Sequence, residues 1–284
     1  MKTVLVYRGP LAGCNYACGY CPFARQAAGP ENLQEDRQAT ARFVGWLAQC
    51  GLSDMGVQFT PRGEALIRPW RQDAVVDISR IPSVSKVAIQ TNLSCDLSWL
   101  ERCDLSRVGL WCTYHPRQVS RQNFLDQCRT LDRLGVRYSV GVVGLREQFG
   151  EIAAMRAHLP RRVYLWINAF KSQGPYYEPG EIRDLTKIDP LFSLSTHRHA
   201  SKGKPCQCGQ NIFAVDGDGT VRRCHFVSGA IGNLYTDDLA QLATPQPCPN
   251  ETCGCHIGYI HMPELNGPEL FGDGILERIP RSQV

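Results

Sequence analysis

The chain of 284 residues is long enough for one large domain, or for a large domain with a small appendage. Hydrophobic residues make up 43% of it and charged residues 20%, which is typical of a globular protein of enzyme size. The net charge is +4 without a block of like charges, and no apolar run approaches membrane-spanning length. We therefore expect neither nucleic acid nor a membrane as a partner. Since no export signal precedes the first strand, we expect a cytoplasmic protein.

Short apolar strands alternate with helices over about the first 170 residues. Strands are expected at residues 2–7, 56–60, 84–91, 108–114, 137–143 and 163–169. Helices are expected at 32–49, 96–103, 120–134 and 149–159, with Asp96 and Ser120 as N-caps and Gly135 after the third. Such alternation indicates βαβ units and a parallel sheet, and six units predict an α/β fold with an incomplete (β/α) barrel. Functional loops then follow the carboxyl ends of the strands.

The second part of the chain has a different character. Glycine, proline and polar residues over 171–205 predict a connecting region. A hairpin is expected from 212–215 and 221–225, then a strand at 229–235 and a short helix at 236–243 capped by Thr236. Residues 248–284 are expected to be irregular. This predicts a core domain at 1–200, a small hairpin domain at 201–265 and a tail at 266–284.

Fourteen cysteines are a high count, and most of them fall into two groups. Three lie at Cys14, Cys18 and Cys21, and six lie between Cys206 and Cys255. Without an export signal, metal binding or reactive thiols are favoured over disulfides. The five scattered cysteines are expected to fill the core as small hydrophobic residues, namely Cys50, Cys95, Cys103, Cys112 and Cys128.

The first group forms a C-x3-C-x2-C run directly after the first expected strand. A cubane iron–sulfur cluster normally takes four thiolates, so three thiolates leave one iron open for reaction. The alternative is a zinc knuckle or a set of free thiols. Zinc sites usually pair C-x2-C units, and no second pair follows here.

With Tyr20 before its last cysteine, the run resembles the signature of the radical S-adenosylmethionine (SAM) superfamily. The resemblance implies a partial (β/α)6 TIM-like barrel and a [4Fe-4S] cluster whose open iron is chelated by SAM. It further implies that an electron from the cluster cleaves SAM to methionine and a 5′-deoxyadenosyl radical. An external electron donor of flavodoxin or ferredoxin type follows as a partner.

Further positions resemble the SAM-binding motifs of this superfamily. In the segment 60–66, Gly63 and Glu64 resemble part of the GGEP motif that recognises the SAM amino group, although Arg62 and Ala65 depart from it. Polar or small residues near later strand ends are expected to bind SAM too: Thr91, Asn92, Thr113, His115, Val142, Gly144 and Asn168. Val142, Gly144 and Glu147 partly match the adenine-binding pattern, and Asn168 is expected to be buried with a ligand as its partner. Each could instead be an ordinary strand-end residue.

The second cysteine group resembles the SPASM and shorter twitch extensions, which carry auxiliary iron–sulfur clusters. Cys206, Gly219 and Cys224 match the start of that pattern, with the glycine in the hairpin turn. Six cysteines are too few for two four-thiolate clusters, so one auxiliary [4Fe-4S] cluster is expected. Its expected ligands are Cys206, Cys224, Cys253 and Cys255, with Cys208 and Cys248 as alternates. A structural zinc site is the alternative, which His225, His256 and His261 could serve unless they are surface or substrate-facing residues.

The resemblance implies hydrogen abstraction from an unactivated carbon. The expected substrate is a small metabolite that is oxidised or rearranged. The alternative is a side chain of a ribosomal peptide or protein, although this chain starts directly with its first strand and not with a peptide-recognition domain. A non-enzymatic alternative is an iron–sulfur electron carrier or a metal-stabilised interaction module.

Overall fold

A curved nine-stranded sheet organises the computed structural model, which describes residues 3–21, 23, 28–171 and 175–283. In spatial order its strands are β12 (Ala230–Asn233), β11 (Thr220–Arg222), β10 (Ile212–Asp216), β1 (Thr3–Arg8), β3 (Met55–Phe59), β5 (Val84–Thr91), β6 (Val108–Tyr114), β7 (Arg137–Val143) and β8 (Leu165–Asn168). The seven strands from β10 to β8 are parallel, and β11 and β12 are antiparallel additions at one edge. The expected α/β fold with an open, partial barrel is confirmed.

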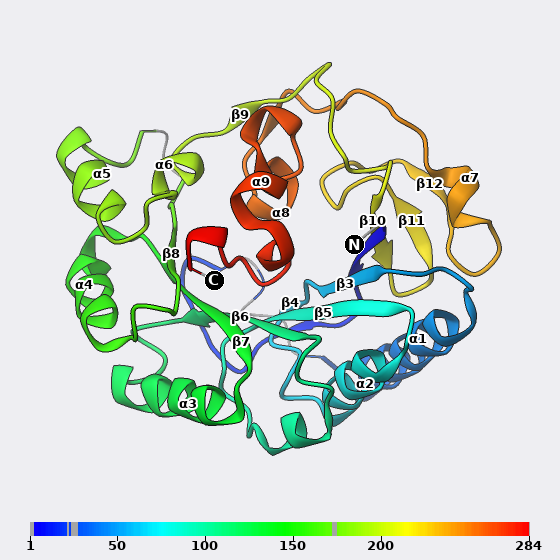
Figure 1. The fold of residues 1–284 in the computed structure, drawn as a ribbon, viewed down its shortest axis with the longest axis horizontal. Coiled ribbons are helices and arrows are strands. Elements are labelled where there is room, and N and C mark those ends of the chain that lie inside the picture. The colour runs from blue at the N-terminus through cyan, green and yellow to red at the C-terminus, as the bar shows by residue number, and fades with distance from the viewer. Residues whose placement is uncertain (1–2, 22, 24–27, 172–174, 284) are drawn as a thin grey trace.

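Helices cover the outside of this sheet. They are α1 (Pro30–Gln49), α2 (Pro69–Arg80), α3 (Arg121–Leu134), α4 (Phe149–His158), α5 (Pro179–Thr186) and α6 (Phe192–Ser195). Figure 1 shows α1 to α5 around the periphery and the C-terminal helices α8 (His256–Tyr259) and α9 (Gly267–Phe271) near the centre. Among the described residues, no helix has both the length and the apolar character needed to cross a membrane.

The expected strands and helices of the first half are found with small shifts at their ends, and Lys2 of the first expected strand lies outside the described residues. Ser120 caps α3 by accepting from the Asn123 N–H at 3.1 Å, and Gly135 ends it with φ 71°. The segment expected as a helix at 96–103 is a 3₁₀ helix at Ser98–Arg102. Helix α2 was not expected, because its buried run at 74–76 hides the helical period.

The second half departs further from expectation. The connecting region contains α5 and α6, and the final segment contains α8 and α9. Thr236 does not cap the short helix α7 (Leu239–Leu242); Asp238 does, by accepting from the Ala240 N–H at 2.9 Å. The hairpin forms as expected, but its second strand ends at Arg222. Its first strand, β10, pairs with β1, so the hairpin extends the core sheet.

The seven parallel strands are largely buried on both faces, as parallel strands between two layers must be. Leu5 and Tyr7 of β1 face the outer helices, where the Tyr7 ring stacks on Phe43 with centroids 4.1 Å apart. Val4 and Val6 face the interior and pack in one cluster with C-terminal side chains such as Met262. The hydrophobic core therefore has an outer part under the helices and an inner part inside the curve of the sheet.

The C-terminal segment fills the interior near the amino ends of the strands. Gln58 donates to the Leu276 carbonyl at 2.9 Å, and Ser139 donates to the Glu277 carbonyl at 2.5 Å. The fully buried Glu277 carboxylate contacts Lys86 Nζ at 2.7 Å and Arg137 Nε at 3.1 Å. The segment expected as a tail thus places Phe271, Leu276 and Glu277 inside the curve of the sheet. The proposed domain boundaries remain a prediction.

We predict that Glu277→Ala lowers the free energy of unfolding by about 3–5 kcal/mol, because it leaves Lys86 without a partner for its charge in a buried site. Urea unfolding followed by circular dichroism measures the change. Asp184→Asn, which removes an exposed ion pair with Lys187, is the matched control and should leave the urea midpoint unchanged. Equal midpoints for both variants would contradict the proposed role of Glu277.

Candidate functional site

The three N-terminal cysteines lie on the loop that leaves the carboxyl end of β1. Cys18 is buried, and Cys14 and Cys21 are half-buried. The Tyr16 N–H donates to Cys14 Sγ at 3.4 Å, and Cys18 Sγ lies 3.5 Å from His115 Nδ1. The thiols of Cys14 and Cys18 thus contact neighbouring groups, and the Cys18 thiol contacts a residue that follows β6. Pro22 and residues 24–27 lie outside the described residues.

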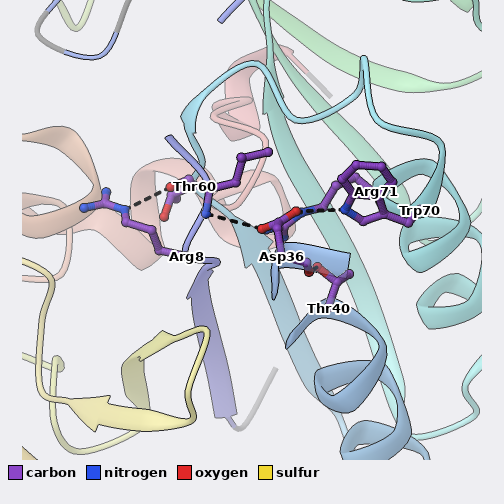
Figure 2. Close-up of polar contacts among 7 residues, drawn as sticks. Arg8, Asp36, Thr40, Thr60, Trp70 and Arg71 are labelled. Atoms are coloured by element: carbon purple, nitrogen blue, oxygen red, sulfur yellow. Dashed lines mark hydrogen bonds and ion pairs between the residues drawn. The ribbon is translucent and has the colours of Figure 1, made fainter. Parts of the chain in front are cut away.

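A buried carboxylate, Asp36 of α1, fixes the start of this loop (Figure 2). It pairs with Arg71 of α2, accepts from Trp70 Nε1 at 2.8 Å and accepts from the Leu11 N–H at 3.4 Å. A Cβ at Gly9 would lie 1.9 Å from the Arg71 guanidinium, so only glycine lets the chain pass here. Two helices thus set the position from which the cysteine loop departs.

Gly63 brings a second loop against the cysteine loop. The short strands β2 (Ala12–Gly13) and β4 (Arg62–Gly63) pair in parallel, and the Glu64 N–H donates to the Gly13 carbonyl at 3.0 Å. Gly63 has φ 128°, and a Cβ there would lie 1.8 Å from the Gly13 oxygen. This close approach of two backbones requires glycine.

Three of the predicted cofactor residues meet at Glu64. Its buried carboxylate accepts from the Leu66 N–H and from Thr91 Oγ1, both at 2.9 Å, and from the Asn92 N–H. Asn92 Nδ2 in turn donates to Asn15 at 2.9 Å and approaches Cys14 Sγ at 3.7 Å. Burial raises the pKa of Glu64 to about 7, although the three donors favour its charged form. A cation that reached this carboxylate would bind and ionise it.

His115 joins the cysteine loop to a cavity. Its Nδ1 lies 2.6 Å from the Tyr20 hydroxyl, and burial lowers its pKa to about 4, so the ring is neutral at pH 7. The cavity has a volume of about 570 Å³, which is within the range of small-molecule sites. Its lining includes Cys18, Tyr20, His115, Glu147 and Phe170. A ligand there would touch the Cys18 thiol and the residues that follow β6 to β8.

A half-open polar layer lies inside the sheet at the carboxyl ends of the strands. Val6, Trp111 and Trp166 point inward and are buried, so by the two-residue alternation of strands the residues two positions later also point inward. Gln90, Val143 and Asp216 hold the equivalent positions of their strands. The resulting set consists of the partly accessible residues Arg8, Gln90, Thr113, Val143 and Asp216 and the exposed residue Asn168. We call these six residues the upper layer. Of these six residues, only Thr113 and Asn168 are expected from the sequence to bind SAM.

Asn168 differs from expectation, and packing inside the protein explains the residue types at Val142 and Gly144. Asn168 is exposed, so the expectation that it is buried is wrong. The Val142 side chain packs in the outer core, because its neighbours on β7 take the inward positions. A Cβ at Gly144 would lie 2.6 Å from the Tyr177 hydroxyl, which donates to the Gly144 carbonyl. Any ligand contact of Val142 would therefore use its backbone.

Five of the six C-terminal cysteines line one small cavity: Cys206, Cys208, Cys224, Cys248 and Cys253. Cys208 lies beside both Cys206 and Cys224, and its thiol lowers the pKa of each of these two cysteines. Cys208, expected only as an alternate, therefore lies between the two cysteines that match the motif best. Cys255 is not among the residues that line this cavity, and it lies near Lys171 and Arg8.

No group of three or more His, Cys, Asp or Glu side chains surrounds a single metal-ion position in the described part of the chain. A cubane cluster binds each thiolate to a different iron, so its ligands are spaced more widely than those of one ion. His256 and His261 are buried, each with one ring nitrogen that has no partner among the described residues, so neither is a surface residue. His225 approaches Thr60 Oγ1 at 3.4 Å.

No protein-family model matches the chain, and no curated protein matches it. Solved structures do. Native anSMEcpe with bound AdoMet aligns with a TM-score of 0.57 and 13% identity over 84% of this chain and 80% of that chain. Streptococcus suis SuiB bound to S-adenosylmethionine aligns with 0.51 and 14% identity over 84% and 64%. Native anSMEcpe with AdoMet and a Cp18Cys peptide aligns with 0.54 and 15% over 84% and 80%. The chain shares the fold of these proteins.

We predict that stability falls as the pH rises through the window set by Glu64. Its pKa in the folded protein, about 7, lies above its ordinary value of 4.5, so the folded state holds the proton more tightly. The stabilisation is complete below pH 4.5 and is lost towards pH 7, with a total of about 3 kcal/mol. Urea unfolding of ligand-free protein across this range, compared with Glu64→Gln, measures it. If the free energy of unfolding of Glu64→Gln changed with pH as steeply as that of the unaltered protein, Glu64 would not be the group responsible.

Proposed function

We propose that this chain, which has the radical SAM fold, is a radical SAM enzyme that binds a [4Fe-4S] cluster through Cys14, Cys18 and Cys21. The observation that carries the proposal is the connection between this loop and Glu64: Asn92 contacts both, at the mouth of the partial barrel. When bound, the cluster and SAM together supply a 5′-deoxyadenosyl radical that abstracts hydrogen from the substrate.

The residues of the site fit these two groups. Three thiols on one loop suit a cubane with one open iron, and the Asn92 amide is placed to orient Cys14. The buried Glu64 carboxylate offers a partner for the SAM ammonium group, and Gly63 lets the backbone of its loop approach. The cavity beside Tyr20, His115 and Glu147 has room for a nucleoside. Thr113, Gly144 and Asn168 lie at neighbouring strand ends and complete the proposed SAM site.

The C-terminal cysteines are proposed to hold one auxiliary [4Fe-4S] cluster. The expected ligand set was Cys206, Cys224, Cys253 and Cys255, with Cys208 and Cys248 as alternates. The shared cavity and the contacts of Cys208 favour Cys208 over Cys255. Five thiols around one cavity exceed the four that a closed cluster needs. The protein would receive electrons from a ferredoxin or flavodoxin.

A small metabolite is the proposed substrate, to be oxidised or rearranged. The half-open upper layer inside the sheet would hold such a molecule next to the cysteine loop. A peptide or protein side chain is the second candidate, because one of the similar anSMEcpe structures contains a peptide. A simple electron carrier would have no use for an accessible polar layer inside its barrel, so the enzyme is favoured over the non-enzymatic alternative.

We predict that the anaerobically reconstituted and reduced protein converts SAM to 5′-deoxyadenosine, which liquid chromatography detects. Cys18→Ala should abolish the product, because two thiolates do not hold the cluster in place. Cys103→Ala, a half-buried cysteine outside both groups, is the matched control and should retain the activity. Absence of 5′-deoxyadenosine from the fully reconstituted protein would sink the proposal.

The auxiliary cluster gives a separate expectation for iron content. We predict about eight irons per chain, and about half of them after Cys14, Cys18 and Cys21 are all changed to Ala. Cys224→Ala should remove the other half and stop conversion of the substrate, while cleavage of SAM to 5′-deoxyadenosine continues. Iron analysis and electron paramagnetic resonance measure the two clusters. Zinc in place of iron at the C-terminal cysteines, or no residual cluster in the triple variant, would refute this part.

A further inference from the structure

Arg223 is a buried arginine in the wall of the cavity that the C-terminal cysteines share. It directly follows β11 and precedes Cys224, and it is only 7% exposed. Its Nη1 donates to the Pro247 carbonyl and its Nη2 donates to the Gln246 carbonyl, both at 2.7 Å. The guanidinium thus ties the end of the hairpin to the two residues that precede Cys248.

The segment that carries Cys208 packs on the same side chain. Gly209, the next residue, has φ 88°, and a Cβ there would lie 2.8 Å from the Arg223 Cβ. This close approach and the positive φ require glycine. Arg223 therefore contacts residues directly beside Cys208 and Cys248. Since it is also joined to Cys224 along the chain, one side chain relates the positions of three of the five cysteines that line the cavity.

The backbone of Cys248 is held on a second side as well. Its N–H donates to the Lys204 carbonyl at 2.9 Å, and its carbonyl accepts from the Gly203 N–H at 2.9 Å. Lys204 lies two residues before Cys206, which also lines the cavity. The contacts of Arg223 are thus part of a frame that brings together segments far apart in the sequence.

The Arg223 guanidinium has no carboxylate partner in the part of the chain that the structure describes. Apart from the thiols, the other side chains that line this cavity and the adjoining cleft, which Arg223 also lines, are uncharged. A cation that is buried without a counter-charge is unfavourable, so the cavity favours an anionic occupant. Acidic side chains on neighbouring segments have partners of their own: Asp216 pairs with Arg222, Glu251 with Lys202 and Glu264 with Lys204, while Asp218, Asp237 and Asp238 accept from backbone N–H groups.

We propose that Arg223 is the positioning residue of the auxiliary cluster and that its charge stabilises the reduced form of that cluster. This inference rests on the proposed function, in which these thiols bind a [4Fe-4S] cluster. Four thiolates give such a cluster a net negative charge, which increases when the cluster takes up an electron. A fixed cation in the cavity wall therefore stabilises the reduced form more than the oxidised form. Arg223 thus raises the reduction potential of the cluster.

A purely structural role is the alternative, in which the guanidinium only holds the carbonyls of Gln246 and Pro247. That role predicts no effect of the charge of Arg223 on the reduction potential. Lysine keeps the charge without the planar fork of donors, and glutamine keeps an amide donor group without the charge. Substitution of Arg223 by each of them therefore separates the two roles.

The test is redox titration of the full chain in which the three N-terminal cysteines are changed to Ala, so that only the auxiliary cluster remains. Electron paramagnetic resonance measures the reduced form. In this parent protein, Arg223→Gln should lower the ratio of reduced to oxidised cluster at a fixed potential by about tenfold, a shift of about 59 mV for one electron. Arg223→Lys should restore most of the ratio.

Arg198→Gln is the matched control. This arginine is exposed beside the cysteine segment, where a Cβ at Gly254 would lie 3.1 Å from its guanidinium. Because water screens an exposed charge, the ratio of reduced to oxidised cluster should stay close to that of the parent. Iron analysis and circular dichroism of each variant show whether the cluster and the fold are retained.

Three results would overturn the proposal. The first is an equal ratio in Arg223→Gln and in the parent, and the second is a ratio in Arg223→Lys as low as that in Arg223→Gln. The third is loss of iron or of the fold from both variants, because geometry and not charge would then be needed. Loss of iron from Arg223→Gln alone, with Arg223→Lys like the parent, would support the proposal. A parent without iron refutes the auxiliary cluster itself, and SAM cleavage by the unaltered protein tests the radical SAM activity separately.

Discussion

The buried pair of Asp36 and Arg71 is the constraint on which the site depends. It joins α1 and α2 under the point where the chain leaves β1, and the Leu11 N–H completes it. A buried pair of this kind is costly to break, because one charge would remain without a partner. The cysteine loop therefore starts from a fixed place.

From that fixed start, the site is assembled by hydrogen bonds between loops that follow different strands. Glu64 follows β4, Asn92 follows β5 and His115 follows β6, and each reaches the cysteine loop directly or through one neighbour. Parallel strands make this possible because all their carboxyl ends lie at one edge. The sheet therefore sets the positions of Glu64, Asn92 and His115, and the loops that carry them provide the side chains of the site.

The interior of the sheet is divided along the strands. Near the amino ends, the C-terminal segment fills it and pairs Glu277 with Lys86. In the middle, the Arg278 guanidinium lies over the rings of the buried Trp111 and Trp166. Near the carboxyl ends, the upper layer stays partly accessible. The chain thus closes one end of its barrel with its own C-terminus and leaves open the end that carries the cysteines.

Local sequence determined the parallel strands, the helix ends at Ser120 and Gly135, and the cysteine loop, because spacing and turn chemistry act between near neighbours. The sequence also placed Glu64, Thr91 and Asn92 at strand ends. Only the tertiary structure decided that these three meet, that Cys208 lies between Cys206 and Cys224, and that Asn168 is exposed. Which distant side chains share a space depends on strand order and on the packing of the C-terminal segment, and neither leaves a periodic signal in the sequence.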